Sequence, residues 1–393
     1  MHYIFKTFNV GSGDCMILLL QNDDKELHIM VDCGYFTKEV NDYITQTFGK
    51  RIDYLIVTHI DNDHICGLIS MLDKIKDLTI HHILYNCYQR TSEDLKDWDE
   101  KMKDNVKRLY GDLPAVVDML EGKINAKTSI PLAELILEND HWKQAWRREY
   151  VTSESAPLDL GNNMGKLIFL SPNQDALDKL DNEYRKLFWQ KLYKKKDADY
   201  NKEESIYEAL MRIVEDGEEE TDEPVSATLL DEKTLKAYAD KSVLPLTDAN
   251  EASIAFVWEC KEHRILFFGD ASPKIVSENL ENVYADLPKP IVFDAIKVSH
   301  HGSAHSTIRE QFKVADSELY FVTGGAKVRP SFQALSRIVT APMSGNINHR
   351  EIRYNRQNEI LQTLNEAEEL KEKFHYSIEA NKNEYSNFRN TII

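Results

Sequence analysis

The sequence lacks the features that direct a chain to an extracellular or membrane setting. Its five cysteines are scattered with no C-x-x-C pair, which fits a reducing compartment better than a disulfide framework. No run approaches the roughly 18 to 20 apolar residues that a membrane span needs. The N-terminus also lacks a basic segment followed by an apolar signal core. We therefore expect a cytoplasmic protein with no membrane partner.

The sequence also has fewer basic than acidic residues. Lys and Arg total 48 against 66 Asp and Glu, a formal net charge of -18. Nonspecific affinity for a phosphate backbone comes from clustered Lys and Arg. This balance therefore argues against a surface that coats nucleic acid, while it leaves room for a locally basic cleft. The hydrophobic share of 42% is enough for a substantial core, in one large domain or two.

Short strand-like and helix-like runs alternate along the first 87 residues, which indicates an α/β layered domain. A β-hairpin is expected around the turn at 11–14, with a strand over 27–31, a helix over 38–48, and strands over 52–57 and 78–85. Strand patterns return at 166–170, 253–259, 264–268, 291–298 and 319–323, and a covering helix is expected over 356–374.

The segments between these runs are charged and have helical periodicity or none. We therefore divide the chain into five parts: a first half of the core (1–87), a helical insertion (88–160), a core strand (161–173), a charged helical or linker insertion (174–249), and a second half of the core with a C-terminal helix (250–393).

Two histidines and two carboxylates follow the apolar run 54–57. His59, Asp61, Asp63 and His64 fall within six residues, ahead of a helix expected to begin near Gly67. A loop can turn all four side chains toward one point, and imidazole with carboxylate suits zinc, manganese or iron. The alternative is a polar loop in which Asp61 or Asp63 caps the following helix. Capping would explain one carboxylate and neither histidine.

Further ligand-type residues stand at other strand ends. Asp32 follows the strand 27–31, Asp270 follows Gly269, and His300 lies in the run 299–303 (Ser-His-His-Gly-Ser). Short loops on one edge of a sheet can gather such residues into one cleft. A carboxylate at Asp270 is suited to bridge two cations about 3.5 to 4 Å apart, which would hold and activate a water.

This ordered set resembles the motifs of the metallo-β-lactamase-fold hydrolases. More narrowly, it is similar to the metallo-β-lactamase domain of the competence-type DNA-internalisation proteins. The narrower resemblance rests on the run 10–14 (Val-Gly-Ser-Gly-Asp), on Asn250-x-x-Ser253, and on the double histidine before Gly302. It implies a four-layer αββα metallo-β-lactamase sandwich, here with helical insertions, and a metal site at the strand ends along one edge.

The resemblance also implies two metal positions that share one carboxylate. The ligands would be Asp63, His64, Asp270 and His300 for one ion, and His59, Asp61 and the bridging Asp270 for the other. Asp32 would orient a ligand histidine.

The chain departs from the family pattern at two ligand positions. Asp61 stands where the family usually has a histidine, and Asn173 lies in the loop where another histidine is common. The competence-type subgroup shares the aspartate. Harder ligands favour Mn²⁺, a single Zn²⁺, or a weakly held second ion. The expected cofactor is therefore one or two Zn²⁺ ions, alternatively Mn²⁺, with Asn173 as an alternative ligand.

The remaining candidates are less tightly defined by their spacing. If His300 and His301 lie on a strand they point to opposite faces, so we expect His300 to be the ligand and His301 the alternative. His305 is a candidate substrate or proton-transfer group, or a loop histidine without a role. The expected substrate-binding residues are Ser303, Asn250 and Ser253, although Ser253 is equally suited to fix a loop by hydrogen bonding.

These residues predict a metal-dependent hydrolase, first of all a phosphodiesterase or nuclease that uses a metal-activated water. Asp61 or Asp63 would position or deprotonate that water. The alternative activity is hydrolysis of a small ester, lactone or amide. A third hypothesis is a sensor or interaction protein on the same scaffold, supported by the missing nitrogen ligands. The expected partners are a nucleic acid or nucleotide substrate, or a protein bound through the helical insertions.

Overall fold

The computed structural model describes residues 1–86, 132–146, 149–180, 230–325, 329–343, 347–356, 358–382 and 384–386. Much of the two predicted insertions, 88–160 and 174–249, therefore lies outside the described residues. Within the described parts of the chain, every helix is too short or too polar to cross a bilayer.

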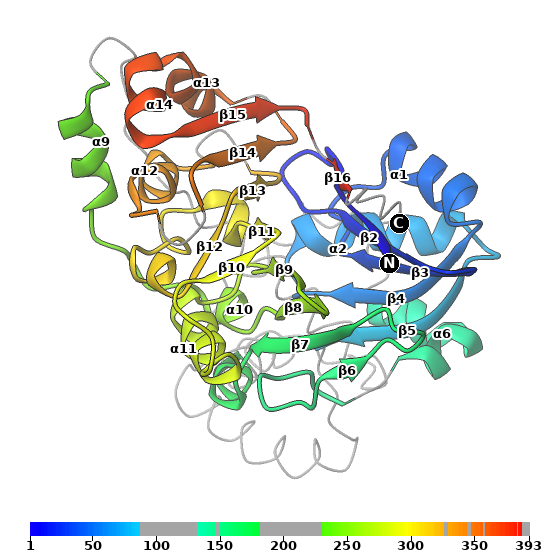
Figure 1. Ribbon diagram of the computed structural model, residues 1–393. Coiled ribbons are helices and arrows are strands. Elements are labelled where there is room, and N and C mark those ends of the chain that lie inside the picture. The colour runs from blue at the N-terminus through cyan, green and yellow to red at the C-terminus, as the bar shows by residue number, and fades with distance from the viewer. Residues whose placement is uncertain are drawn as a thin grey trace, which may run out of the picture.

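Two sheets form the centre of the molecule (Figure 1). The first has the order β16-β1-β2-β3-β4-β5, and its strands are β1 (His2–Thr7), β2 (Met16–Asn22), β3 (Lys25–Val31), β4 (Arg51–Val57), β5 (Thr79–Tyr85) and β16 (Glu384–Ser386). The second has the order β15-β14-β13-β11-β9-β8-β7-β6, and its strands are β6 (Leu158–Asp159), β7 (Lys166–Ser171), β8 (Ala255–Cys260), β9 (His263–Phe267), β11 (Ala295–Lys297), β13 (Leu319–Val322), β14 (Arg350–Tyr354) and β15 (Tyr376–Ala380). A separate pair joins β10 (Ile291–Phe293) to β12 (Ala315–Ser317).

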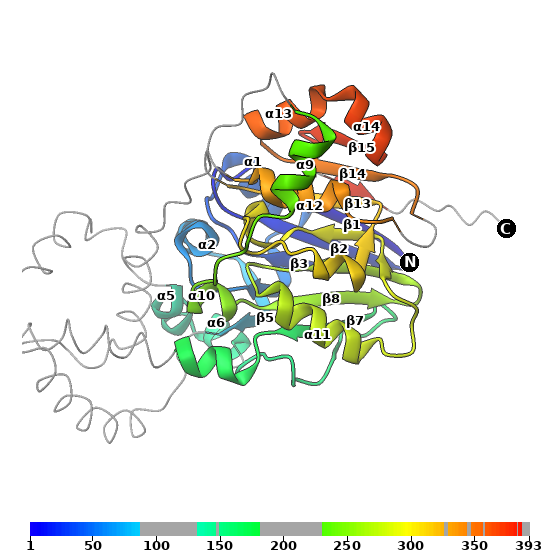
Figure 2. The ribbon, with the colours of Figure 1, turned by 90° about the vertical axis from the view of Figure 1, so that its left-hand side faces the viewer.

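Helices cover the outer face of each sheet. On the first sheet they are α1 (Lys38–Asp42), which continues as a π-helical turn (Tyr43–Thr47), α2 (Asn62–Lys74), α5 (Leu132–Glu138) and α6 (Asp140–Ala145). On the second they include α9 (Glu232–Ala239), α11 (Pro273–Val283), α12 (Phe332–Thr340), α13 (Glu359–Glu366) and α14 (Glu368–Phe374). Figure 2 shows α9, α11 and α12 in front of the second sheet. The short helix α10 (Asp248–Glu251) precedes β8.

Three buried apolar clusters correspond to the three interfaces of a four-layer sandwich. One lies between helices and the first sheet, one between helices and the second, and one between the sheets. In the last, the ring of Phe5 packs edge-to-face against Phe267 and Phe321, at centroid distances of 5.1 and 4.7 Å. Such rings bury large apolar areas and hold the sheets together. The predicted αββα class is therefore confirmed.

Strand direction brings the predicted polar strand ends to the same edge. Strand β3 is parallel to β4, and β9 is parallel to β11. The loop after each of these strands contains a candidate ligand or its supporting residue. Because parallel strands place their carboxyl ends together, loops far apart in sequence meet there.

Three expected elements differ in the structure. The strand 291–298 is two strands, because Asp294 between them accepts hydrogen bonds from the Arg264 N–H (2.8 Å) and His263 Nδ1 (3.2 Å). The helix 356–374 is broken at Ala367 into α13 and α14. Helix α2 begins at Asn62 rather than near Gly67, since its first turn is polar and therefore invisible to apolar periodicity.

The described part of the predicted first insertion packs on the core. In α6, the Trp142 indole N–H donates to the Leu78 carbonyl (3.1 Å), and the Trp146 indole N–H donates to the Tyr85 carbonyl (3.2 Å). These two contacts hold the helix against β5. The division into a core with two insertions stays a prediction.

Candidate metal centre

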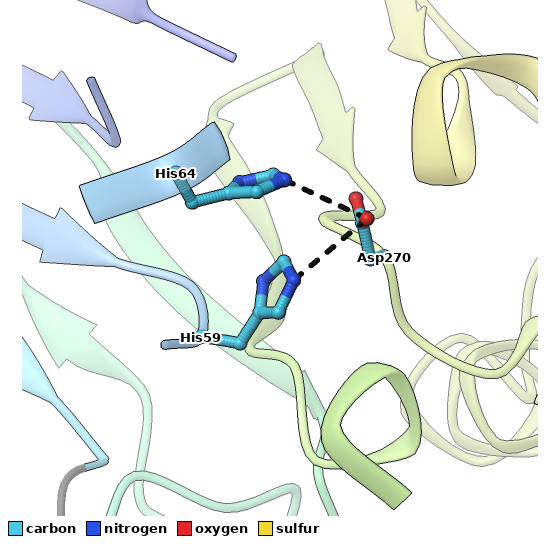
Figure 3. Close-up of side chains that lie close together, drawn as sticks. All are labelled: His59, His64 and Asp270. Carbon is cyan, nitrogen blue, oxygen red and sulfur yellow. Dashed lines mark ion pairs between the residues drawn. The ribbon is translucent and has the colours of Figure 1, made fainter. Parts of the chain in front are cut away.

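Three buried side chains from separate elements point toward one another (Figure 3). His59 lies two residues after β4, His64 in the first turn of α2, and Asp270 in the loop after β9. Asp270 Oδ2 is 3.5 Å from His64 Nε2 and 3.7 Å from His59 Nε2. These separations are too long for hydrogen bonds. They match the ~3.4 Å expected between two ligands that each lie about 2.1 Å from a tetrahedral ion.

A second group of potential ligands overlaps the first. It consists of Asp63, His64 and His301. His301 Nε2 is 3.1 Å from Asp63 Oδ2, and His64 Nε2 is 3.8 Å from Asp63 Oδ1. His301 Nε2 also lies 4.0 Å from Asp270 Oδ2. Asp270 is thus placed between the two groups, while His64 Nε2 can serve only one ion.

The donor atoms at this centre fit a bound cation. Among the described residues, the buried atoms His59 Nε2, His64 Nε2 and Asp270 Oδ1 have no hydrogen-bond partner. Leaving such atoms buried and unpaired is costly. A divalent ion that prefers imidazole and carboxylate, such as Zn²⁺ or Mn²⁺, would satisfy all three.

Electrostatics favour positive charge at the same point. Burial opposes ionisation of Asp270, but His300 and His64 outweigh it and lower the pKa of that carboxyl well below its usual value. Burial would lower the pKa of His64, but the charges of Asp270, Asp32 and Asp63 raise it well above the usual value. A bound cation would supply the same positive charge and displace the proton from His64.

Asp32 holds His64 in the orientation that presents Nε2 to Asp270. The Asp32 carboxylate accepts from His64 Nδ1 (2.9 Å), from the Thr58 N–H (2.7 Å) and from the Thr58 hydroxyl (2.7 Å). The carboxylate only accepts, so His64 Nδ1 carries a proton, and Nε2 is the nitrogen that a cation would bind on displacing the other proton. This is the orienting contact that the family resemblance implied for Asp32, and His64 as a metal ligand stays a prediction.

We expect Asp32→Asn to weaken metal binding by about 10- to 100-fold, the usual cost of losing an orienting carboxylate. Asp32 has a φ of 55°, a conformation that asparagine tolerates, so the fold should be kept. Competition titration with a chromogenic chelator measures the affinity. Asp73→Asn on the exposed face of α2 is the matched control. Equal metal affinity in both variants and the parent would contradict the proposed role of Asp32 in orienting His64.

His59 is fixed by two hydroxyls. The Thr58 hydroxyl gives its proton to Asp32, so it accepts from His59 Nδ1 (3.0 Å), which leaves His59 Nε2 unprotonated. Ser253 Oγ lies 3.4 Å from His59 Nδ1 and accepts from the Asp270 N–H (3.1 Å). Predicted as a substrate-binding residue, Ser253 is buried and contacts two of the candidate ligands.

Gly269 allows this close approach. Its φ is 54°, and a Cβ there would meet Ser253 Oγ at 2.6 Å and the Ile254 carbonyl oxygen at 2.8 Å. Only glycine fits such a position without strain.

Asp61 and Asp63 both lie at the start of α2. Asp61 is at the N-cap position, but its side chain makes no capping hydrogen bond. Its Oδ2 lies instead 3.2 Å from His59 Nε2. Asp63 lies in the first turn and faces His301. The capping alternative therefore does not account for either carboxylate.

His300 and His301 lie in a turn and not on a strand, so the alternation on which the choice of His300 is based does not apply. They form a 3₁₀ turn, Ser299–Gly302, with φ of 48° and 53°. The His301 Nδ1–H donates to the Thr323 carbonyl (3.0 Å), which leaves Nε2 toward Asp63. Burial opposes charge on His301, yet Asp14 and neighbouring carboxylates raise its pKa to about 9. His301, the sequence alternative, is thus the histidine placed in the ligand group.

His300 faces a guanidinium that sequence reasoning missed. Arg329 Nη1 donates to His300 Nε2 (2.6 Å), and His300 Nδ1 contacts Ser306 Oγ (3.1 Å). Burial and the positive charge of Arg329 outweigh the effect of Asp270 and lower the pKa of His300 to about 3. His300 Nε2 still lies 3.6 Å from Asp270 Oδ2, so its role as a ligand stays a prediction.

A buried ion pair supports the centre from behind. Lys297 Nζ pairs with Asp14, and both side chains are fully buried. Lys297 Nζ also lies 4.0 Å from Asp270 Oδ1, while Asp14 Oδ1 lies 3.3 Å from His301 Nδ1. Burial opposes both charges, but each partner stabilises the other, raising the pKa of Lys297 and lowering that of Asp14. In the sequence, the only feature that pointed to this ion pair was Lys297, a charged residue inside an otherwise apolar strand-like run.

The remaining predicted residues are buried or take part in local hydrogen bonds. Asn173 Oδ1 accepts from the Ala176 N–H (2.9 Å), which gives that oxygen a local structural use. Asn250 is buried in α10, and Ser303 Oγ accepts from the His305 N–H (3.1 Å). His305 Nδ1 accepts from the Leu244 N–H (3.3 Å). Catalytic or substrate-binding roles for these residues stay predictions.

Comparison with known proteins gives the class of this fold. Residues 10–137 match the family model "Metallo-beta-lactamase superfamily". Together with the four layers and the histidine-carboxylate residues at the strand ends, this match shows that the chain has the metallo-β-lactamase fold, on which most known members are metal-dependent hydrolases. The narrower similarity to competence-type proteins stays a prediction.

Similar solved structures are distant. The metallo-beta-lactamase fold protein YhfI from Bacillus subtilis is 9% identical, with 98% of this chain and 99% of that chain covered and a TM-score of 0.38. A mutant of the CmlA beta-hydroxylase is 11% identical, with 98% of this chain and 53% of that chain covered and a TM-score of 0.37. The chain has no significant match among curated proteins.

Proposed function

We propose that this protein is a metal-dependent phosphodiesterase. The observation that carries the proposal is a guanidinium beside two overlapping ligand groups. Arg329 reaches His300, whose Nε2 lies 3.6 Å from Asp270, the carboxylate placed between the two groups. Two cations and a guanidinium around one point suit an anionic substrate with charged oxygens, as a phosphodiester has.

The chain's own residues would hold and orient the reactants. Bound at these groups, the ions would supply Lewis acidity and a water of lowered pKa. Asp61 and Asp63 stand at the edge of the centre, where a carboxylate oxygen can accept a proton from a water. The Arg329 guanidinium would donate to a non-bridging phosphate oxygen, moving away from His300 Nε2 as it does so.

Assays on purified protein test the reaction class. We expect bis(p-nitrophenyl) phosphate to be hydrolysed, the activity to be lost with EDTA, and Zn²⁺ or Mn²⁺ to restore it. p-Nitrophenyl acetate and a lactone are assayed beside it. Turnover of the ester or lactone without phosphodiesterase activity would instead support the small-molecule hydrolase. Tight metal binding without turnover of any substrate would support the sensor or interaction protein.

We expect Arg329→Ala to lower kcat/KM for the phosphodiester by about 10- to 100-fold, because hydrogen bonds to charged groups contribute roughly 1.5 to 3 kcal/mol. Turnover of an uncharged ester at the same centre should fall far less, since it offers no anionic oxygen. Arg329→Lys keeps the charge without the planar fork and should recover part of the loss. An equal fall with charged and uncharged substrates would show that Arg329 acts only through His300.

A further inference from the structure

A cavity of ≈ 370 Å³ opens beside the candidate metal centre. Its walls are residues 10–13, residues 34, 35 and 37, and the first two residues of α2, Asn62 and Asp63. Ligand sites for small molecules begin at about this size. The cavity and the centre share Asp63, whose side chain is 31% exposed while that of Asp270 is 2% exposed. Asp63 is therefore where the buried centre meets the cavity.

The lining of the cavity does not suit a phosphate group. Among the described residues, the lining contains no Lys, Arg or His, and its one charged side chain is the carboxylate of Asp63. Ser12, Thr37 and Asn62 provide hydroxyl and amide groups, and the glycine-rich run 10–13 provides exposed peptide edges. The described lining therefore suits an uncharged group that forms hydrogen bonds.

Tyr35 gives the cavity an aromatic wall. Tyr35 is 67% exposed, the highest value among the exposed large hydrophobic residues of the described chain. Its backbone is held in place, because its carbonyl accepts from the Thr37 N–H (3.1 Å) and the Cys33 thiol (3.5 Å). An exposed aromatic residue on an anchored stretch of backbone, beside a cavity, is suited to stacking with a nucleobase.

The cavity floor is joined rigidly to the metal centre. A Cβ on Gly13 or Gly34 would lie 1.8 or 1.9 Å from the carbonyl oxygen of Asp63, so both glycines pack directly on that residue. The Asp14 N–H donates to the same carbonyl (3.0 Å). A group bound in the cavity would therefore sit at a fixed distance from the ions.

We propose that this cavity is a nucleobase subsite, in which a base stacks on Tyr35 while its attached phosphodiester reaches the metal centre past Asp63. The substrate class is then a nucleotide phosphodiester. This inference rests on the proposed phosphodiesterase function. It adds a preference for substrates with a planar, uncharged ring next to the scissile phosphate.

A ratio of two activities tests the subsite. We compare kcat/KM for thymidine 5′-(p-nitrophenyl phosphate) with that for methyl p-nitrophenyl phosphate, which has the same leaving group and no base. Tyr35→Ala should lower the ratio by about 5- to 150-fold, the range found for loss of one stacked base. Tyr35→Phe should retain the ratio, because it keeps the ring. Ser12→Leu should lower it by filling the cavity with Tyr35 intact.

Val292→Ala is the matched control, since Val292 is 46% exposed on β10 and does not line the cavity. A ratio unchanged in both Tyr35→Ala and Ser12→Leu would overturn the subsite while the phosphodiesterase function stands.

If the parent hydrolyses neither substrate, the phosphodiesterase function fails. Calorimetric titration of parent and Tyr35→Ala with thymidine 5′-monophosphate and with methyl phosphate then decides the subsite. Tyr35-dependent binding of the nucleotide alone supports it, and equal or absent binding of both ligands overturns it.

Discussion

Asp270→Asn is expected to abolish metal-dependent turnover, with kcat/KM falling by at least about 10³-fold. Asp270 Oδ2 lies within 4.0 Å of His59, His64 and His301, which together belong to both candidate ligand groups. An amide in its place would remove the negative charge that two bound cations would share. The contribution of such cations to a transition state is several kcal/mol, which corresponds to ~10³-fold in rate. Activity assays and metal analysis on the same preparation measure both consequences.

The control for this variant is Asp77→Asn. Asp77 forms an exposed ion pair with Lys50, of the kind that contributes little to stability, and its loss should change neither metal content nor activity. Near-UV circular dichroism of Asp270→Asn should match the parent, because the isosteric amide fills the same space. An Asp270→Asn protein with parental metal content and turnover would refute the centre.

Lys297→Met is expected to lower the free energy of unfolding by about 3 to 5 kcal/mol, the cost of leaving one charge of a buried pair without its partner. The Asp14 carboxylate would remain fully buried, and in the described structure it would keep a hydrogen bond from the Thr323 hydroxyl and the proximity of His301. Urea unfolding followed by circular dichroism measures the change.

The double variant Asp14→Asn/Lys297→Met distinguishes the effect of the ion pair on stability from the effect of side-chain packing. With both charges removed, no carboxylate is left unpaired, so most of the lost stability should return. If the double variant is as unstable as the sum of the two single variants, Asp14 and Lys297 act independently. The stability of the fold would then not depend on their ion pair.

The strand ends were predictable because their signals are local. The apolar run before His59 and the Gly269-Asp270 turn each occupy a few adjacent residues. Parallel β3 and β4, and parallel β9 and β11, then bring those ends to one edge. The contact of Asp32 with His64 follows the same logic, since Asp32 follows β3 and His64 lies in the helix after the neighbouring parallel strand β4.

Other features of the site depend on distant parts of the chain. Arg329 reaches His300 from a separate segment, and the Asp14–Lys297 pair joins the two sheets across 283 positions. No spacing or periodicity links such residues. The choice between the two histidines likewise depends on a turn with positive φ, which a strand-like apolar pattern before it does not reveal.

The sequence by itself determined the fold class, the order of the polar strand ends and the kind of donor atoms, because these follow from residue type and short-range pattern. Only the tertiary structure decided that His301 faces Asp63, that His300 meets Arg329, and that Tyr35 lines a cavity beside Asp63. These contacts arise where separate loops are packed together, and packing across loops is set by the whole fold.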